Sequence, residues 1–359
     1  MTETAIPQTS TAAQRADEEL SAVVRATPLA TELDAAREET EALAFGVSAH
    51  DLGWMRRVAV TGEDRFRWLS GMVTNTVNDL DANAGAWNLV LNAQGRILGE
   101  LHVWRQNDNL ELEIAADQHD RLLAHLERFI IMDDVELKPL SEESALGLAG
   151  PLSAELLARL GLPALTEPLT GVRAGWNGLE VRVARGYGVL APHYELWVPT
   201  TEIPALWKAL VEAGATAVGA AALEAFRIAE GIPAYGIDIA ERDLPQETAQ
   251  MRALNFNKGC YLGQEIVERI RSRGSVHRHL RPLEIFGALP ASGTPLTLDG
   301  GATAGEITSA AELPLAKGNR SFALGMIRVA AELSNKSFTY TTDTGNGSAR
   351  ILGAPPKLS

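Results

Sequence analysis

The chain has 359 residues, of which 46% are hydrophobic and 22% are charged, a composition typical of a soluble globular protein of two or three domains. Its net charge of −14 argues against a duplex DNA-binding protein, because such proteins need a positive field. Cys260 is the only cysteine, which excludes an internal disulfide and favours a reducing, cytoplasmic location. No apolar run reaches the roughly 18 residues of a membrane helix, so we expect no membrane partner.

Residues 1–45 are expected to form a flexible acidic extension. Nine acidic and three basic residues give residues 1–44 a charge of −6, and none of these residues is aromatic. Such a segment buries too little apolar surface to offset the entropy lost on ordering. Alanine and glutamate favour a short helix near Leu33–Leu43 within it.

Residues 46–137, together with residues 220–282, are predicted to form a first α+β unit. Its expected strands are Arg57–Val60, Trp87–Leu91, Ile97–Trp104 and Leu110–Ile114. In the last of these strands, apolar residues alternate with Glu111 and Glu113. We therefore expect both glutamates to face solvent.

Three helices are predicted in this unit. Thr61, three residues before Asp64, resembles a capping box and predicts a helix start. The amphipathic pattern of Leu122–Ile130 predicts a second helix. A third helix is expected at Ala220–Glu230, ended by Gly231.

Residues 138–219 have the pattern of a second, ferredoxin-like α+β unit. Strands are expected at Leu146–Leu148, Leu179–Ala184, Tyr194–Val198 and Ala215–Val218, and helices at Ala154–Leu160 and Ile203–Ala213. The order β-α-β-β-α-β is that of the split βαβ motif. No glycine-rich phosphate loop follows a strand, which excludes a Rossmann fold.

Residues 283–359 are predicted to form a small antiparallel β-barrel. The strand-like runs are short and separated by glycine and proline, at Leu283–Ile285, Thr294–Leu298, Gly305–Ser309 and Phe322–Ile327. The predicted fold class is therefore α+β with a C-terminal barrel.

The most informative string is N-K-G-C-Y-L-G-Q-E at residues 257–265. Its two glycines, four residues apart, indicate a tightly folded backbone. Lys258 lies two residues from the Cys260 thiol, and a nearby cation favours a reactive thiolate. The alternative interpretation is that Cys260 is a small buried hydrophobic residue.

This string resembles the K-G-C-[FY]-x-G-Q-E signature of the YgfZ family, folate-binding proteins related to the aminomethyltransferases (T-proteins) of the glycine cleavage system. Arg227–Pro233 is similar to the family's R-I-x-x-G-x-P helix end, and Gly305–Ser309 to its G-x-V/I-T-S strand. The resemblance covers about residues 46–330. It implies a ring of two intertwined α+β units and a C-terminal barrel around a central folate pocket.

The resemblance also implies a function. It indicates a protein that binds tetrahydrofolate, or a derivative of it, and supports iron–sulfur cluster assembly or repair in client enzymes, including tRNA-modifying ones. One-carbon or redox chemistry is implied at Cys260, beside the folate pocket, with Lys258 tuning the thiol and Gln264 or Glu265 holding the loop. Two alternatives remain: a true aminomethyltransferase, and a folate-sensing adaptor without chemistry.

One departure separates this chain from the T-proteins. Gly99 and Glu100 stand where the T-proteins carry two aspartates, one of them catalytic. Glu100 is still a carboxylate base, but its extra methylene displaces the charge. A misplacement of about 1 Å costs on the order of 100-fold in rate.

Two charged residues are candidates for folate contacts. Glu195 resembles the pterin-reading glutamate of the T-proteins, and its alternative is a solvated strand glutamate. Arg227 resembles a folate-contacting arginine, since guanidinium groups match carboxylates. Its alternative is a salt bridge to Glu224 or Glu230.

Aromatic residues supply the stacking surface that a pterin needs. Trp54, Trp87 and Trp197 are candidates, and Trp54 is favoured because its surroundings are polar. Glu100, Tyr261 and Gln264 complete the candidate folate-binding set.

The segment Arg252–Arg281 carries a local charge of +5, from seven basic and two acidic residues. Such a field suits a folate polyglutamate tail, an acidic partner or an RNA, and RNA is not favoured. His277 and His279 lack a third ligand nearby in the sequence, so we expect structural histidines and no metal.

Overall fold

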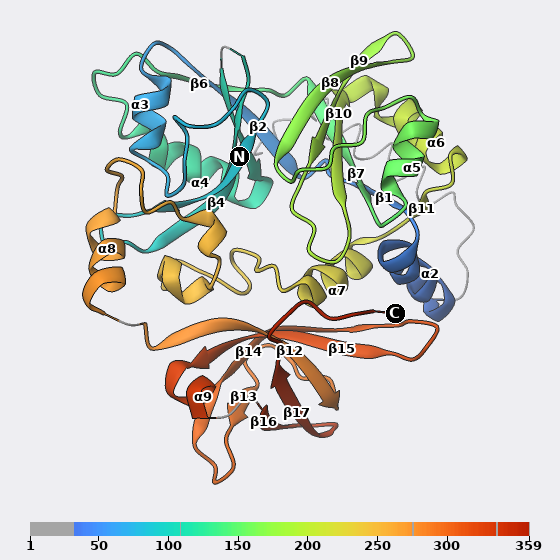
Figure 1. Cartoon of the computed structure of the whole chain (residues 1–359), viewed down its shortest axis with the longest axis vertical. Helices are drawn as coiled ribbons and strands as arrows, with labels where there is room; N and C mark the ends of the chain where they lie inside the picture. Colours follow the sequence, from blue (N-terminus) through green and yellow to red (C-terminus); the bar gives the residue numbers. More distant parts are fainter. Residues whose placement is uncertain (1–31, 108, 275, 335–336, 359) are drawn as a thin grey trace, which may run out of the picture.

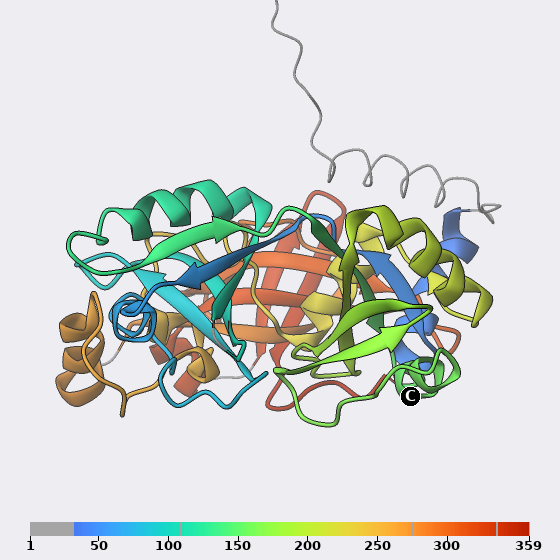
Figure 2. The ribbon, with the colours of Figure 1, turned by 90° about the horizontal axis from the view of Figure 1, so that it is seen from above.

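The structure is a computed structural model that describes residues 32–107, 109–274, 276–334 and 337–358. Two α+β units lie side by side above a β-barrel (Figure 1). From above, the strands of the barrel lie beneath both units (Figure 2). None of the helices in these ranges is long and apolar enough to span a membrane.

The first unit is an antiparallel sheet with helices α3 (Arg65–Ser70) and α4 (Ala116–Glu127). Its strands are β2 (Met55–Thr61), β3 (Gly85–Leu91), β4 (Ile97–Arg105), β5 (Leu110–Ala115) and β6 (Glu136–Pro139), in the order β3-β4-β5-β2-β6. The predicted capping box is wrong, because no side chain caps α3. Asp64 instead accepts a hydrogen bond from the backbone N–H of Asp134, at 2.9 Å.

The second unit has the predicted ferredoxin-like elements and two further strands. Its strands are β1 (Ser48–Asp51), β7 (Glu143–Ala149), β8 (Thr170–Trp176), β9 (Leu179–Arg185), β10 (His193–Pro199) and β11 (Thr216–Ala217), with helices α5 (Ser153–Arg159) and α6 (Ile203–Glu212). The order is β11-β1-β7-β10-β9-β8. Strand β8 extends the sheet at one edge, and β1 is inserted between β11 and β7.

The inserted strand intertwines the two units. Ala49 of β1 pairs with Leu148 of β7 on one side and with Ala217 of β11 on the other. The expected boundary, which assigned all of residues 46–137 to the first unit, is therefore wrong for β1. The chain contributes β1 to the second sheet before it enters the first sheet through β2.

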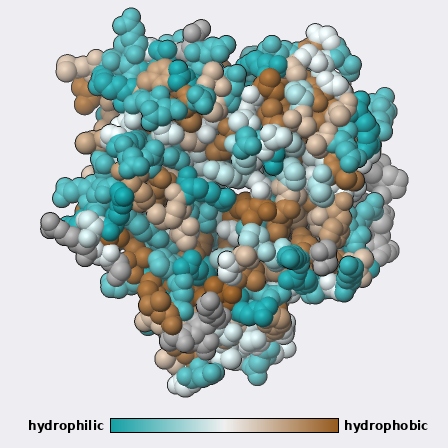
Figure 3. All heavy atoms as spheres, viewed as in Figure 1, coloured by the Kyte–Doolittle hydropathy of each residue, from teal (hydrophilic) through white to brown (hydrophobic). Residues whose placement is uncertain are grey.

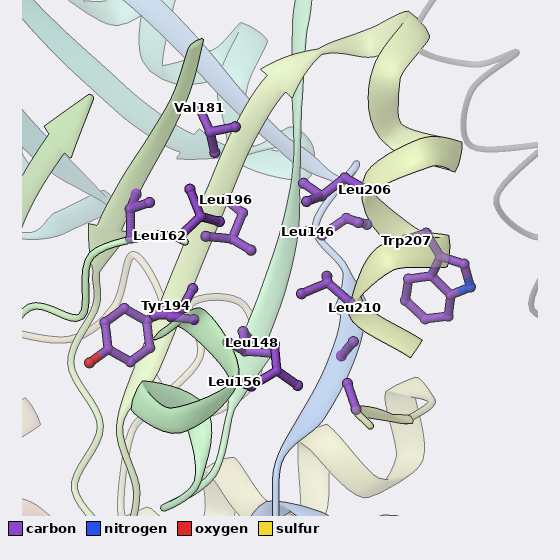
Figure 4. Packing of buried hydrophobic residues seen from close by; sticks show 14 of the residues in the cluster. Leu146, Leu148, Leu156, Leu162, Val181, Tyr194, Leu196, Leu206, Trp207 and Leu210 are labelled. Carbon is purple, nitrogen blue, oxygen red and sulfur yellow. The ribbon is translucent and has the colours of Figure 1, made fainter. Parts of the chain in front are cut away.

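The core of the second unit lies between its sheet and its helices. Leu146 and Leu148 of β7 point toward Leu206 and Leu210 of α6, and all four are fully buried (Figure 4). Burying a leucine side chain contributes roughly 1.5–3 kcal/mol. This packing explains why the periodicity of residues 203–213 predicted a helix correctly.

The end of the acidic N-terminal segment is folded. Helix α2 (Glu32–Phe45) packs against α7 (Ala220–Glu230), where Leu43 and Phe226 share a buried cluster. The expectation of a flexible extension is therefore wrong for residues 32–45, because this amphipathic helix has an apolar partner. Residues 1–31 lie outside the described part of the chain.

The C-terminal part is the predicted barrel. It closes in the order β12-β15-β14-β13-β16-β17. The strands are β12 (Arg278–Gly287), β13 (Pro295–Thr297), β14 (Thr303–Leu313), β15 (Arg320–Arg328), β16 (Ser337–Thr342) and β17 (Gly345–Ile351), with α9 (Val329–Ser334) between β15 and β16. On the face in Figure 3, hydrophobic residues gather where the barrel meets the two units.

A polar layer joins the two sheets. Arg57 of β2 forms ion pairs with Glu111 of β5 and with Glu143 of β7 in the other unit. Arg182 of β9 lies 3.4 Å from Glu111. Glu111 and Glu113 are only 6% and 1% exposed, so the predicted solvent-facing glutamates are wrong. Their face of β5 is covered by the second sheet, and Arg57 of the same sheet together with Arg182 of the second sheet supplies the cations that make their burial tolerable.

Candidate functional site

A cavity of about 260 Å³ lies between the two units. Its lining includes four aromatic residues, two carboxylates, three imidazoles and one guanidinium: Trp54, Trp87, Tyr187, Tyr194, Glu100, Glu195, His50, His102, His193 and Arg252. Strands β4 and β10 carry the two glutamates into the cavity from opposite units. Flat aromatic walls with a few converging polar groups are typical of a small-molecule site.

Glu100 is held in the wall of the cavity by two donors. Its carboxylate accepts hydrogen bonds from Trp87 Nε1 at 3.0 Å and from the backbone N–H of Tyr235 at 3.3 Å. Burial raises the pKa of Glu100. A carboxylate with a raised pKa can accept a proton near neutral pH.

The neighbouring position, Gly99, cannot take the aspartate of the T-protein pattern. A Cβ added there would lie 2.7 Å from Gln118 Oε1 and 3.0 Å from the Leu122 side chain. Helix α4 therefore occupies the space that an aspartate side chain needs. Only Glu100 supplies a carboxylate from this pair of positions.

Glu195 is a half-buried group in the cavity wall and not a fully solvated strand residue. Its Oε2 accepts a hydrogen bond from Trp197 Nε1 at 2.9 Å. Burial, and then the charge of neighbouring Glu113, raises the pKa of Glu195 well above its ordinary value. The group therefore carries a proton at a pH where an exposed glutamate is ionised.

The candidate tryptophans differ in what they can contact. Trp54 is 53% exposed and lines the cavity. Trp87 is buried and also lines the cavity. Trp197 is fully buried, and the Cζ atom of Arg57 lies 4.9 Å from the centroid of its ring. It is not among the described residues that line the cavity. Stacking on a ligand is therefore open to Trp54 and Trp87 and closed to Trp197.

Arg227 forms its hydrogen bonds and ion pairs with other residues of the protein. Its guanidinium donates to Glu224 at 2.8 Å, to Asp238 at 2.7 Å and to the carbonyl of Ile232. It is not among the described lining residues. The salt bridge to Glu224 expected as its alternative is present, and Arg227 fixes the end of α7.

The K-G-C-Y-L-G-Q-E loop lies outside the cavity lining. Lys258 Nζ donates to the backbone carbonyls of Ser70, Val73 and Asn75, at 2.7, 2.5 and 2.8 Å. Burial lowers the pKa of Lys258 to about 7, and the three carbonyls oppose that shift by stabilising the ammonium form. The ammonium therefore holds the loop to the segment after α3, and the expectation that it tunes the Cys260 thiol stays a prediction.

The rest of the loop is arranged by packing. Cys260 is exposed, so it is not the small buried residue of the alternative interpretation. Tyr261 is buried in a cluster with Trp87, whose ring faces the cavity. Gln264, at the start of α8 (Gln264–Arg273), accepts a hydrogen bond from the Tyr261 N–H at 3.3 Å. The described residues that line the cavity do not include Cys260, Lys258, Tyr261 or Gln264.

The predicted basic segment is not a continuous positive surface. Arg278 pairs with Asp243 at 2.6 Å and with Glu247 at 3.1 Å. Arg281 and His279 both pair with Glu332, as expected for a structural histidine. These pairs reduce the positive field of the segment at Arg278 and Arg281.

Sequence reasoning missed all three histidines, both tyrosines and the arginine of this lining. Arg252 was visible only as part of a charge count, and Tyr187 and His193 only as neighbours of Glu195 in the chain. His193 Nε2 lies 3.5 Å from the buried Glu230. The G-Y pair at 186–187 shortly before Glu195 was the local signal that pointed to this region.

Comparison with known proteins identifies relatives across most of the chain. The model of the GCVT N-terminal domain matches residues 21–258. A chloroplastic protein of Arabidopsis thaliana described as a putative transferase is 26% identical, over 90% of this chain and 74% of its own. An aminomethyltransferase of Rubrobacter xylanophilus is 28% identical, over 77% of this chain and 76% of its own.

A solved structure confirms the predicted fold. The glycine cleavage system aminomethyltransferase T from Bartonella henselae superimposes with a TM-score of 0.79, at 21% identity and 89% coverage of both chains. The expected T-protein-like ring of two α+β units and a barrel is therefore the fold of this chain.

Proposed function

Because the chain belongs to the family of the GCVT N-terminal domain, we propose that it binds tetrahydrofolate, or a derivative of it, in the cavity between its two α+β units. The observation that carries this proposal is the lining: aromatic faces, two half-buried carboxylates and a guanidinium that converge on one space. A pterin is a flat ring with hydrogen-bond donors on one edge and acceptors on another, so it matches these groups.

The size of the cavity fits one part of this ligand. Sites that enclose whole drug-sized ligands measure roughly 300–1,000 Å³. A volume of about 260 Å³ suits the bicyclic ring, and the p-aminobenzoyl-glutamate tail then lies toward the mouth, beside Trp54. Arg252 Nε, a buried polar atom that makes no hydrogen bond in the described part of the chain, is further evidence that the space takes a polar ligand. Bound tetrahydrofolate would supply a carrier for one-carbon units.

We further propose that the chain belongs to the YgfZ branch and supports iron–sulfur cluster assembly or repair in client enzymes, including tRNA-modifying ones. The string at residues 257–265 and the Gly99–Glu100 departure support this branch. Cys260 is exposed and therefore accessible to a partner protein. Tyr261, packed in one cluster with Trp87, connects the loop to the cavity wall.

The test compares Cys260→Ala with wild type in cells that lack the protein, with the activity of an iron–sulfur client enzyme as the readout. We expect lost support for the client with unchanged stability and folate affinity. Full support by Cys260→Ala would remove thiol chemistry and favour a folate-sensing adaptor. Since the side chain is exposed, the substitution leaves the core untouched.

An aminomethyltransferase activity is an equally supported alternative, because a specific observation favours it. Glu100 is a half-buried carboxylate with a raised pKa in the cavity wall, where a base would meet the ligand. Incubation with tetrahydrofolate and an aminomethylated lipoyl carrier tests it. Release of methylenetetrahydrofolate by wild type, and its loss in Glu100→Gln, would establish the activity, whereas no turnover by wild type would remove it.

A further inference from the structure

Arg252 is a cavity-lining guanidinium whose charge has no carboxylate partner within the described part of the chain. Its Cζ lies 5.0 Å from the ring centroid of Trp87 and 4.5 Å from that of Tyr187. Its Nε is buried and makes no hydrogen bond there. The backbone is fixed as well, because Asn75 Nδ2 donates to the Arg252 carbonyl at 2.9 Å.

The acidic groups nearest to Arg252 are already occupied. Glu100 accepts from Trp87 Nε1 and from the Tyr235 N–H. Glu230 accepts from the backbone N–H groups of Val189 and Leu190, at 2.8 and 2.9 Å. Both act on Arg252 only through their field. The guanidinium is therefore positioned by aromatic faces, and its donors remain available to a ligand.

A guanidinium carries donors and no acceptor. It pairs with a carbonyl oxygen or a bare ring nitrogen, and it cannot pair with an amino group. The carboxyl of Glu195, in the same lining, can accept from a donor edge. The two groups together suit a ring with donors on one edge and an oxo group on another.

We propose that Arg252 is the specificity-determining residue of the cavity and that it selects 4-oxo pterins over 4-amino pterins by donating to the ring oxygen. This inference rests on the proposed folate binding. Replacing the oxo group by an amino group would set donor against donor in a buried site. The expected discrimination is about 10- to 100-fold in affinity, the value of one hydrogen bond to a charged group.

The experiment titrates folic acid and its 4-amino analogue aminopterin into wild type and two variants, with dissociation constants from calorimetry. Arg252→Met keeps the apolar stem between Trp87 and Tyr187 but removes every donor. Arg271→Met is the matched control, because Arg271 also covers an aromatic ring, that of Phe256 at 4.3 Å, outside the lining. We expect wild type and Arg271→Met to prefer folic acid by at least about 10-fold, and Arg252→Met to lose that preference.

Other results overturn the inference in distinguishable ways. Equal affinity of wild type for both ligands would remove Arg252 as a selector while leaving folate binding intact. An equal loss of affinity for both ligands in Arg252→Met would mean that Arg252 contributes only to packing. If wild type bound neither ligand, the proposed function itself would fail. Should Arg252→Met not fold, Arg252→Lys keeps a charge, and a preference reduced relative to wild type is then expected.

Discussion

Gly263 of the K-G-C-Y-L-G-Q-E loop packs directly on Gly95 of the turn between β3 and β4. A Cβ added to Gly263 would lie 3.1 Å from Gly95 Cα and 2.6 Å from the Asn92 carbonyl oxygen. Gly263 also has a φ of +83°, which side chains other than glycine rarely adopt. The loop that carries Cys260 is thereby fixed to the turn that leads into β4 and Glu100.

Gly263→Ala should therefore destabilise the fold. Both the positive φ and the contact with Asn92 oppose a Cβ, and together they should cost about 2–4 kcal/mol in the free energy of unfolding. Urea unfolding of the variant measures this cost. Gly259→Ala is the control in the same loop, since a Cβ there meets nothing within 4 Å. Equal stability of the two variants would contradict the packing.

Lys258→Met should also destabilise the loop. It removes three hydrogen bonds to backbone carbonyls and leaves those acceptors without a donor. We expect a loss of about 2–4 kcal/mol in the free energy of unfolding. Lys208→Met, on the exposed face of α6 where the lysine pairs only with Glu212 at 3.7 Å, should change it by less than about 1 kcal/mol. The same small effect for both would show that Lys258 does not hold the loop.

Stability should fall in mild acid because of His50. Burial, and then the charge of His193, lowers the pKa of His50 from 6.5 to about 3. Between these values the unfolded chain binds a proton that the folded chain does not, so the free energy of unfolding decreases as the pH falls. Between pH 7 and pH 5, His50 lowers the free energy of unfolding by about 2 kcal/mol.

Urea unfolding at both pH values measures that loss. His50→Gln should show a smaller decrease between pH 7 and pH 5, while His277→Gln, at an exposed position, should behave as wild type. An identical decrease in all three proteins would mean that His50 titrates normally in the folded state.

Folate binding should release protons. The pKa of Glu195 is raised in the free protein, and amino donors of a pterin favour its ionised form. Affinity should therefore rise with pH, and the binding enthalpy should depend on the ionisation enthalpy of the buffer. Glu195→Gln should lose this dependence and bind about 10- to 100-fold more weakly. Binding without proton release in wild type would place the ligand away from Glu195.

The sequence alone predicted the elements whose signals are local. Helix α7 occurs at the expected residues 220–230, because an amphipathic run ends at Gly231, with a φ of +74°. Strand β8 was missed since its residues are small or polar and it lies at a sheet edge. Strands β16 and β17 were missed for a similar reason, being rich in Ser, Thr and Gly.

Features that depend on contacts between the two units could not be predicted from the sequence. The alternation in β5 predicted a solvent-exposed face, and only the second sheet, with Arg182, shows why Glu111 and Glu113 are buried. In the sequence, Arg252 was only one charge of a basic segment, yet in the structure it packs against two aromatic rings at the cavity. Glu195 and Glu100 were recognised through a resemblance, whereas their partners required the structure.

The most direct test of the account is a calorimetric titration of tetrahydrofolate into wild type, Gly186→Leu and Gly175→Leu. Gly186 lines the cavity, and a Cβ there has room, 3.9 Å from Glu195 Oε1, so leucine should fill the site without breaking the fold. Gly175, on the exposed edge strand β8, is the control because a Cβ there meets nothing within 4 Å. We predict micromolar binding to wild type and Gly175→Leu, and binding at least about 10-fold weaker to Gly186→Leu. Absence of binding to wild type at millimolar ligand, or equal binding to all three, would contradict a folate site in this cavity.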